Sequence, residues 1–393
     1  MKIFKSLIAY FFIFLSIKIY FKKPKQSNVV IYGKDGSDLF YNNIKGLKAF
    51  IFNTGRESVN LYVLYQTILN NGFRNILKNY RKNFLKNYLK PKVIITFLDI
   101  SPTFYLLKSD LHPLKFTTIV IQSSWRNETN YVGFNKKLLK LYYCDYFFYQ
   151  SDANKNVIIN KVNSRKIKFL RLGSYKNNCI KIIKTKSKNL KKRNVFYISQ
   201  FKEKDLDPNS SIHRNIFYEK KLIHLIKKYC TEKKLNFKII VKRGCHPGFD
   251  TDSYRKKINY LNHFGKVYKD FFEIDDSIKL IGNTIKTNNY SRVDEADIVI
   301  FESSTLGLEA ISRGKKVVAC PIKISTLCYK KKNEIDFFCI SNLNYKTLSK
   351  KMNLLLSMSL KKYHDKTKKS KLWIKYDYKN KLFLSFFNSL RFK

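Results

Sequence analysis

Cysteine is scarce in this chain of 393 residues, and its spacing is unfavourable for cross-links. The seven cysteines lie at positions 144, 179, 230, 245, 320, 328 and 339, and they include no Cys-x-x-Cys pair. This pattern excludes the disulfide scaffold of a small secreted protein and disfavours a thiolate metal site. Several cysteines lie in strand-like apolar runs, so we expect reduced core residues in a cytoplasmic protein that binds no metal.

Acidic residues are also few, because 28 Asp and Glu stand against 78 Lys and Arg for a formal net charge of +50. Such a charge attracts nucleic acids, anionic lipids and phosphorylated substrates. The lysines are nevertheless spread along the whole length among many Asn and Ile residues, a pattern that a genome-wide residue bias also produces. No zinc-finger spacing and no RNA-binding aromatic signature accompanies them. We therefore expect only weak, salt-sensitive and non-specific binding to nucleic acid.

The N-terminal apolar run is shorter than the ~20 residues that a membrane-spanning helix needs. It covers Ser6 to Ile17 and continues through Ile19 to Phe21, with lysines at positions 2, 5, 18, 22, 23 and 25. No small-residue cleavage site follows, which disfavours a removable signal peptide. The pattern predicts that residues 1–25 form a helix lying on an anionic membrane surface, at the cytoplasmic face of the inner membrane. A short single span and a helix packed on the protein's own core are the alternatives.

The rest of the chain alternates strand patterns with helical patterns, which predicts parallel sheets covered by helices. Its length and its 44% apolar content suffice for two such domains. We expect a Rossmann-like domain at 26–174, a polar hinge at 175–193, a second Rossmann-like domain at 194–345, and C-terminal helices at 346–393 that pack back on the first domain. The expected strands are 28–32, 48–52, 92–98, 116–121, 145–149, 166–170, 194–199, 237–241, 277–280, 298–301, 317–320 and 336–340.

The segment DIVIFESSTLGLEAISRGKKVVACP, from Asp297 to Pro321, predicts a βαβ unit. Ser303, Ser304 and Thr305 can cap its helix, and Gly314 ends it. In open parallel sheets, ligands bind beyond the carboxyl ends of the strands, often at a helix N-terminus that favours anions. This loop is therefore a candidate phosphate site, with an ordinary helix cap as the alternative.

A second candidate segment, VKRGCHPGF from Val241 to Phe249, follows an expected strand. Lys242 and Arg243 are fixed cations suited to a diphosphate. His246 can hold a phosphate oxygen or donate a proton to it, because its unperturbed pKa of about 6.5 permits donation at neutral pH. The alternative is a surface histidine in a basic turn.

His246-Pro247 and Ser303-Ser304 are similar to the HP and SS motifs of bacterial sialyltransferases and capsule polysialyltransferases. In those families the histidine and the serines hold the nucleotide phosphate of CMP-sialic acid. The stretches SSTLGLEAISRGKKV, GRESVNLYVL, ITFLD and IQSSWR more closely resemble a family of bacterial surface-carbohydrate biosynthesis proteins. Together these matches extend from about Val29 to about Pro321.

This resemblance implies a GT-B fold, in which two doubly wound α/β domains face a cleft, as in GT-B glycosyltransferases and in nucleotide-sugar epimerases of similar build. It also implies a nucleotide-sugar donor, with CMP-linked sugars among the candidates, and no further cofactor. Glu309 would then accept hydrogen bonds from the donor ribose, because a carboxylate suits a vicinal diol. A favourable helix glutamate without a ligand is the alternative for Glu309.

On the acceptor side, transfer needs a carboxylate that takes the proton of the acceptor hydroxyl. Sialyltransferases carry an acidic-Asp-Gly motif there, whereas this sequence has Lys34-Asp35-Gly36. Asp99 directly follows an expected strand and is our first candidate for the base, with Asp35 and Glu128 as alternatives. The remaining candidates for this side are Gln122 and Arg126, although a surface ion pair would also explain the arginine.

The expected function is thus that of a membrane-associated, metal-independent glycosyltransferase of surface or capsule polysaccharide biosynthesis. Its substrates would be a nucleotide sugar and a glycan or lipid-linked acceptor. One alternative is a polyol-phosphate transferase similar to teichoic-acid polymerases, which share the fold. The other is a non-enzymatic, basic nucleic-acid-binding protein.

Overall fold

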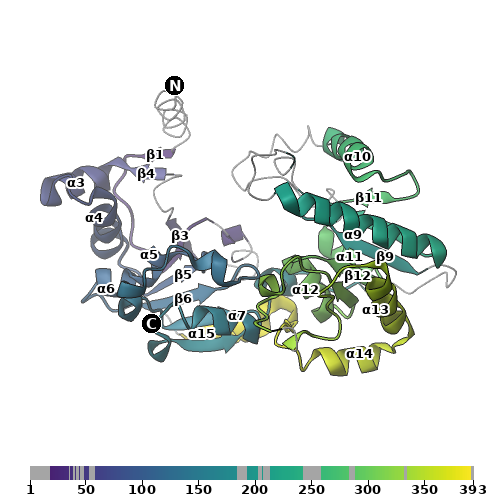
Figure 1. Ribbon diagram of the computed structural model, residues 1–393. Helices are drawn as coiled ribbons and strands as arrows, with labels where there is room; N and C mark the ends of the chain where they lie inside the picture. The colour runs from purple at the N-terminus through teal and green to yellow at the C-terminus, as the bar shows by residue number, and fades with distance from the viewer. Residues whose placement is uncertain are drawn as a thin grey trace.

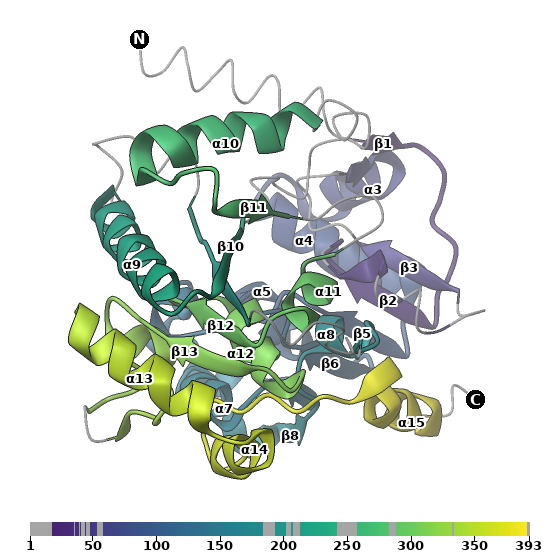
Figure 2. The ribbon, with the colours of Figure 1, turned by 90° about the vertical axis from the view of Figure 1, so that its right-hand side faces the viewer.

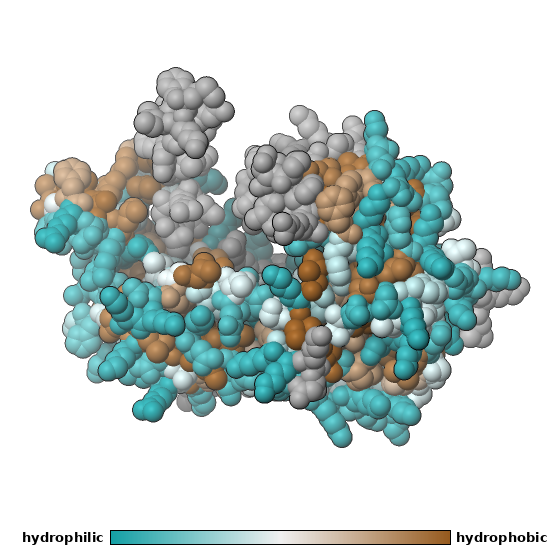
Figure 3. Space-filling model, in the orientation of Figure 1, coloured by the Kyte–Doolittle hydropathy of each residue, from teal (hydrophilic) through white to brown (hydrophobic). Residues whose placement is uncertain are grey.

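Two α/β lobes lie side by side and are joined along their lower edge (Figure 1). The computed structural model describes residues 18–34, 36–38, 40, 44, 48–52, 58–183, 193–201, 206, 213–241, 258–282, 288–331 and 334–390. The space-filling view shows the molecular surface notched between the lobes (Figure 3). This arrangement is the one expected of a GT-B-like fold.

The N-terminal lobe contains a six-stranded, wholly parallel sheet with the strand order β3-β2-β5-β6-β7-β8. Its strands are β2 (Val29–Tyr32), β3 (Ala49–Phe52), β5 (Val93–Thr96), β6 (Thr117–Ile121), β7 (Tyr146–Tyr149) and β8 (Lys168–Arg171). Both faces of the sheet are buried, which explains why these strands are almost continuous apolar runs. The order places the first strand inside the sheet, as in doubly wound folds.

Helices and short helical turns cover this sheet. They are α3 (Leu61–Asn71), α4 (Ile76–Asn83), the π-helix η1 (Phe84–Leu89), α5 (Pro102–Tyr105), α6 (Leu107–Asp110), η2 (Glu128–Tyr131), η3 (Lys136–Leu141), α7 (Asp152–Ile158), η4 (Ser164–Lys166) and α8 (Tyr175–Asn178). Helix α3 begins where the side chain of Asn60 accepts a hydrogen bond of 3.1 Å from the amide of Val63.

The C-terminal lobe contains a five-stranded parallel sheet with the strand order β11-β10-β9-β12-β13. Its strands are β9 (Asn194–Ile198), β10 (Asn236–Ile240), β11 (Lys279–Ile281), β12 (Ile298–Phe301) and β13 (Lys316–Ala319). From β9 the chain adds β10 and then β11 on one side of the sheet. It then crosses back, so that β12 and β13 lie on the other side of β9. The strand order therefore reverses between β9 and β12, and open α/β sheets bind ligands at this kind of switch point.

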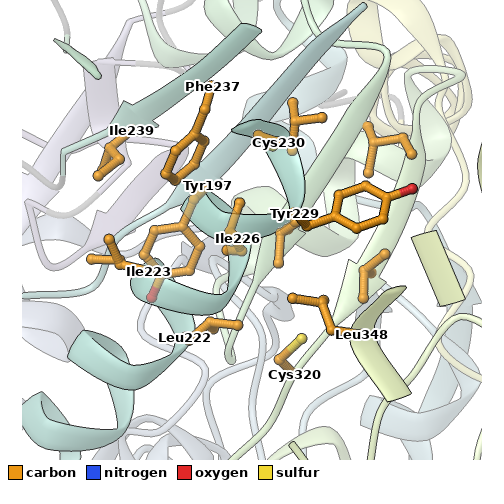
Figure 4. Packing of buried hydrophobic residues seen from close by; sticks show 14 of the residues in the cluster. Tyr197, Leu222, Ile223, Ile226, Tyr229, Cys230, Phe237, Ile239, Cys320 and Leu348 are labelled. Atoms are coloured by element: carbon orange, nitrogen blue, oxygen red, sulfur yellow. The ribbon is translucent and has the colours of Figure 1, made fainter. Parts of the chain in front are cut away.

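The core of the C-terminal lobe is built on alternating side chains of β9. Val195 and Tyr197 point to one face, and Phe196 and Ile198 point to the other. On the first face, helix α9 (His213–Glu232) places the apolar side chains of its buried stripe against the sheet (Figure 4). The labelled members of this cluster are Tyr197, Leu222, Ile223, Ile226, Tyr229, Cys230, Phe237, Ile239, Cys320 and Leu348.

Helix α9 lies between α10 and α13 (Figure 2). The other helices from this point onward are α10 (Ile258–Phe272), α11 (Asn289–Asp294), α12 (Thr305–Ser312), η7 (Ile324–Leu327), α13 (Tyr345–Ser357), α14 (Leu360–Thr367), η9 (Tyr378–Asn380) and α15 (Lys381–Ser389).

The expected strand at 336–340 is only an isolated bridge between Ala319 and Cys339. The six described cysteines are free thiols, and Cys245 lies outside the described residues.

The C-terminal segment is divided between the lobes, whereas we expected all of 346–393 to pack on the first domain. Helices α13 and α14 belong to the second lobe, where the hydroxyl of Tyr363 accepts a hydrogen bond of 3.0 Å from the amide of Val317. Helix α15 and the short turn η9 before it return to the first lobe, where Phe383 and Phe387 contact Phe40 and Asn380 donates a hydrogen bond of 3.1 Å to the carbonyl of Tyr175. The expected boundary missed this because α13 and α14 also carry apolar stripes, which fit either lobe.

The described part of the N-terminal segment differs from the helix expected for residues 1–25. Lys18–Tyr20 forms a strand, β1, which pairs in parallel with β4 (Ser58–Asn60). Ile19 and Tyr20 have side chains that favour a strand, and β4 supplies the backbone partners that a strand needs. Residues 1–17 lie outside the described part, and no described helix is long and apolar enough to cross a membrane.

Candidate active site where the two lobes meet

The switch point of the C-terminal sheet brings two polar loops together. Ser199 and Gln200 follow β9, and Glu302 and Ser303 follow the neighbouring strand β12. The Ser303 hydroxyl donates a hydrogen bond of 3.4 Å to the side-chain oxygen of Gln200. Residues 302–306 are only partly buried, so this loop is accessible at the edge where a ligand is expected.

Helix α12 starts in this loop and presents an open N-terminus. Ser304 is its first flanking residue, and the Ser304 side chain makes no capping hydrogen bond. Gly307 allows close packing beneath it, because a Cβ atom there would lie 2.1 Å from the Phe301 ring. The first amides of the helix and the Ser304 hydroxyl can therefore bind an anion.

A loop of the N-terminal lobe contacts this helix start. The amide of Trp125 donates a hydrogen bond of 3.0 Å to the Thr305 hydroxyl, and the Trp125 indole donates one of 3.1 Å to the carbonyl of Thr326. Thr305 thus joins the lobes, a role that the phosphate-site prediction did not include. Arg126 is the next residue of the same loop.

Asp99 and Arg126 form a buried ion pair. The Asp99 side chain is inaccessible, and its two oxygens accept hydrogen bonds of 3.0 and 2.9 Å from Nε and Nη2 of Arg126. Ser123 and Tyr131 donate to the same carboxylate at 3.2 and 3.3 Å. Within the described part of the chain, Nη1 of Arg126 makes no hydrogen bond and can serve a ligand.

This geometry disfavours the predicted role of Asp99 as the base. Every oxygen of its carboxylate is occupied, and a base must offer an open oxygen to the acceptor hydroxyl. The structure instead suits Asp99 to holding Arg126 in place.

Gln122 and Glu128, the other two described acceptor-side candidates, do not join this ion pair. Gln122 is buried and makes hydrogen bonds of 3.0 Å to the backbone of Ser124 and Gln150. Both ends of the Gln122 side-chain amide are therefore used to hold the loop after β6 in place. Glu128 begins η2 and is exposed to solvent. Asp35 lies outside the described residues, as do the donor-side candidates Lys242, Arg243 and His246.

Glu309 is buried between the lobes and not open to a ribose, in contrast to its predicted role. Ser174, at the end of the N-terminal lobe, donates a hydrogen bond to its carboxylate. Burial raises the pKa of Glu309 to about 7, and the hydrogen bonds from Ser174 and Tyr290 offset this only in part. Arg313 directly follows α12 and pairs with Asp294. It also donates hydrogen bonds to Asn177, Ile180 and Lys181, in the polypeptide that joins the lobes.

Replacing Glu309 with glutamine should change how stability depends on pH. The unfolded carboxyl titrates near 4.5, whereas folded Glu309 keeps its proton up to about pH 7. Between these values the folded state holds a proton that the unfolded state has lost, so the parent loses stability as the pH rises. The glutamine does not titrate. We therefore expect the melting temperature of Glu309→Gln to rise relative to the parent between about pH 5 and about pH 8.

Glu128→Gln, at an exposed glutamate, controls for the loss of one negative charge. A constant difference in melting temperature between Glu309→Gln and the parent across the whole range would show that the buried carboxyl is not held neutral.

Sequence reasoning missed a pair of carboxyl groups beside the Ser303 loop. Burial raises the pKa of Glu219 to about 7, and burial also raises the pKa of Glu302. Ser199 donates a hydrogen bond to Glu219 and also contacts the Tyr268 hydroxyl. Ser199 could have been found from its position directly after the apolar run of β9, whereas Glu219 lies mid-helix and carries no such signal.

A protein-family model described as "putative O-antigen biosynthesis protein" matches residues 119–391, which is more than half of the chain. The chain belongs to this family. The match includes the Trp125–Arg126 loop, the whole C-terminal lobe and α15, so both sides of the candidate site lie within it. It also confirms the expected resemblance to proteins of surface-carbohydrate biosynthesis.

Solved structures of similar fold show the fold class of this chain. A glycosyltransferase from Rickettsia africae matches with a TM-score of 0.50 and 13% identity, over 94% of this chain and 100% of the other. A UDP-N-acetylglucosamine 2-epimerase matches with a TM-score of 0.52 and 10% identity, over 94% of this chain and 98% of the other. At this identity the likeness shows the fold alone, and it confirms the expected GT-B architecture. No curated protein matches the sequence, and the similarity to the sialyltransferase motifs stays a prediction.

Proposed function

We propose that this member of the family is a glycosyltransferase, which moves a sugar from a nucleotide-linked donor to a glycan or lipid-linked acceptor. The observation that carries the proposal is the open start of α12 at the β9–β12 switch point, in contact with the Arg126 loop of the other lobe. An anion-binding helix start at this position suits the phosphate of a nucleotide. The family match to O-antigen biosynthesis supports a polysaccharide product.

In the proposed reaction the acceptor hydroxyl oxygen forms a bond to the anomeric carbon, and the bond from that carbon to the donor phosphate breaks. The leaving phosphate would gain negative charge beside the amides and hydroxyls of Ser303 and Ser304 and beside Nη1 of Arg126. These groups favour the charge as it develops, which is how fixed dipoles and cations accelerate such steps. Lys242, Arg243 and His246 are proposed to add to this site from the loop after β10.

The proposed donor site needs no metal, because the helix start and the basic side chains supply positive charge. The proton of the acceptor hydroxyl would pass to a carboxylate of the N-terminal lobe. With Asp99 committed to Arg126, Asp35 and Glu128 are the proposed candidates. We also propose that the apolar N-terminal residues hold the protein at the cytoplasmic face of the inner membrane, near a lipid-linked acceptor.

Changing both Ser303 and Ser304 to alanine tests this proposal. A thermal-shift screen with CMP-, UDP-, GDP- and CDP-linked sugars first identifies the donor, and calorimetry then measures its affinity. We expect the double variant to bind the donor more weakly by about 1–3 kcal/mol, the usual loss for hydrogen bonds to a charged group. Its melting temperature should change little, because neither hydroxyl caps α12 in the structure.

The matched control removes two exposed serine hydroxyls of α13 through Ser349→Ala and Ser357→Ala. Unchanged donor affinity together with a lower melting temperature in the Ser303/Ser304 variant would show that the two serines support the fold and do not bind the donor. The glycosyltransferase proposal would then lose its donor site.

A further inference from the structure

The turn between α3 and α4 carries a patch of exposed apolar side chains. We call Tyr65, Leu69, Phe73 and Leu77 the elbow patch; they are exposed by 60%, 61%, 78% and 64%. Of the large hydrophobic side chains that are exposed in the described residues, seven lie between Ile19 and Leu77. Scattered apolar residues are normal on a surface, whereas such a concentration marks an interaction site.

Helix α3 is apolar on the face that points away from the core. Val63 and Thr67 are buried against the lobe. Tyr65 and Leu69 each follow one of these residues by two positions, which is about 200° around a helix. They therefore point to solvent, and Phe73 and Leu77 continue the patch across the turn into α4. The lobe does not need these side chains for its own core.

The surroundings of the elbow patch are strongly basic. From Lys18 to Leu98 the sequence contains 15 Lys and Arg but only three Asp and Glu. Lys18, Lys22, Lys23 and Arg74 are exposed. Arg74 directly follows Phe73 in the sequence, and Lys18 lies on β1, which contacts α3. Apolar and cationic side chains exposed together match the interface of an anionic bilayer, where hydrocarbon lies directly beneath negative headgroups.

The apolar surface continues from the elbow patch toward the chain's N-terminal segment. Strand β1 pairs with β4, which leads into α3, and Ile19, Tyr20 and Phe21 are exposed by 42%, 52% and 71%. Figure 3 shows hydrophobic surface along this upper edge of the N-terminal lobe. In the sequence, the apolar run from Ser6 to Ile17 directly precedes β1.

We propose that the elbow patch inserts into the interfacial region of an anionic membrane, as a second contact besides the N-terminal segment. Phe73 and the leucines would enter the headgroup–acyl boundary while the neighbouring lysines and Arg74 pair with lipid phosphates. Two separate contacts would fix the orientation of the N-terminal lobe on the bilayer, whereas one contact alone leaves the lobe free to rotate about it.

A fluorescent reporter in the full chain tests insertion directly. The chain has only two tryptophans, Trp125 and Trp373, and both are at least partly buried. Phe73→Trp adds an indole at the tip of the elbow patch, and Leu354→Trp adds one at an exposed position of α13 on the other lobe. With vesicles of phosphatidylcholine and phosphatidylglycerol, we expect a blue shift and quenching by brominated lipids for Phe73→Trp alone. A vesicle-bound protein whose Phe73→Trp indole is not quenched would overturn the proposal.

A second variant measures the contribution to binding. Leu69→Ser, Phe73→Ser and Leu77→Ser in one full chain should lower the vesicle partition coefficient by at least about tenfold, because three apolar side chains leave the interface. The control Leu354→Ser, Leu360→Ser and Leu382→Ser changes three exposed leucines elsewhere and should leave it unchanged. If the elbow variant instead binds vesicles like the parent and loses a dimer in solution, the patch contacts a second copy of the chain and the proposal is wrong.

Discussion

Replacing Arg313 with methionine is expected to lower the free energy of unfolding by about 3–5 kcal/mol. The guanidinium is inaccessible and uses all five of its N–H donors. Two go to the equally buried carboxylate of Asp294, and the others go to the Asn177 side chain at 2.8 Å and to the carbonyls of Ile180 and Lys181 at 3.1 Å. Methionine fills much of the space but removes both guanidinium hydrogen bonds to the buried carboxylate of Asp294.

The control for this variant is Arg292→Met, which removes an arginine from α11, the helix that carries Asp294. Arg292 pairs with Glu295 at 3.1 Å, and both side chains are partly exposed. A pair of this kind contributes about 0–1 kcal/mol. Urea unfolding followed by circular dichroism measures both variants. Equal losses for Arg292→Met and Arg313→Met would contradict a central role for Arg313 in joining α12 to the polypeptide between the lobes.

Arg126→Gln is expected to impair both stability and transfer. The exchange leaves the carboxylate of Asp99 buried and unpaired, which costs about 3–5 kcal/mol of unfolding free energy. It also removes the cation that we place beside the donor phosphate. A hydrogen bond to a charged group contributes about 1.5–3 kcal/mol, so we expect kcat/KM to fall by at least about tenfold.

A double variant separates these two effects. Adding Asp99→Asn to Arg126→Gln replaces a broken ion pair with two neutral amides, which should restore most of the lost stability. Transfer should stay low, because the cation is still missing. A double variant that recovers both stability and transfer would show that Arg126 only supports the fold, and the proposed contact with the donor phosphate would be wrong.

The sheets could be read from the sequence because buried parallel strands are continuous apolar runs. Ile298 to Phe301 and Val195 to Ile198 are such runs, and their ends locate the loops that form the candidate site. The start of α12 could also be predicted, because polar residues and then a helical pattern directly follow the apolar run of β12. The strand order could not be predicted, because no local sequence pattern indicates that β9 and β12 pair with each other.

The partners of the site residues could not be predicted, because they depend on how the lobes meet. Thr305 contacts Trp125, which is 180 residues away, and Glu309 contacts Ser174, which is 135 residues away. Asp99 follows its strand, as a catalytic carboxylate often does. Its carboxylate nevertheless accepts hydrogen bonds from Arg126, which the sequence did not indicate. A position after a strand shows where a side chain emerges but not which groups it meets.

The central claim is that the nucleotide phosphate binds at the start of α12, opposite the Arg126 loop. Hydrogen–deuterium exchange of the full chain, with and without the nucleotide sugar identified by the thermal-shift screen, tests it most directly. We predict slower exchange in peptides that cover residues 302–306 and 123–126, because the open amides of the helix start would bond to phosphate. Saturated donor binding with unchanged exchange in both peptides would contradict the claim.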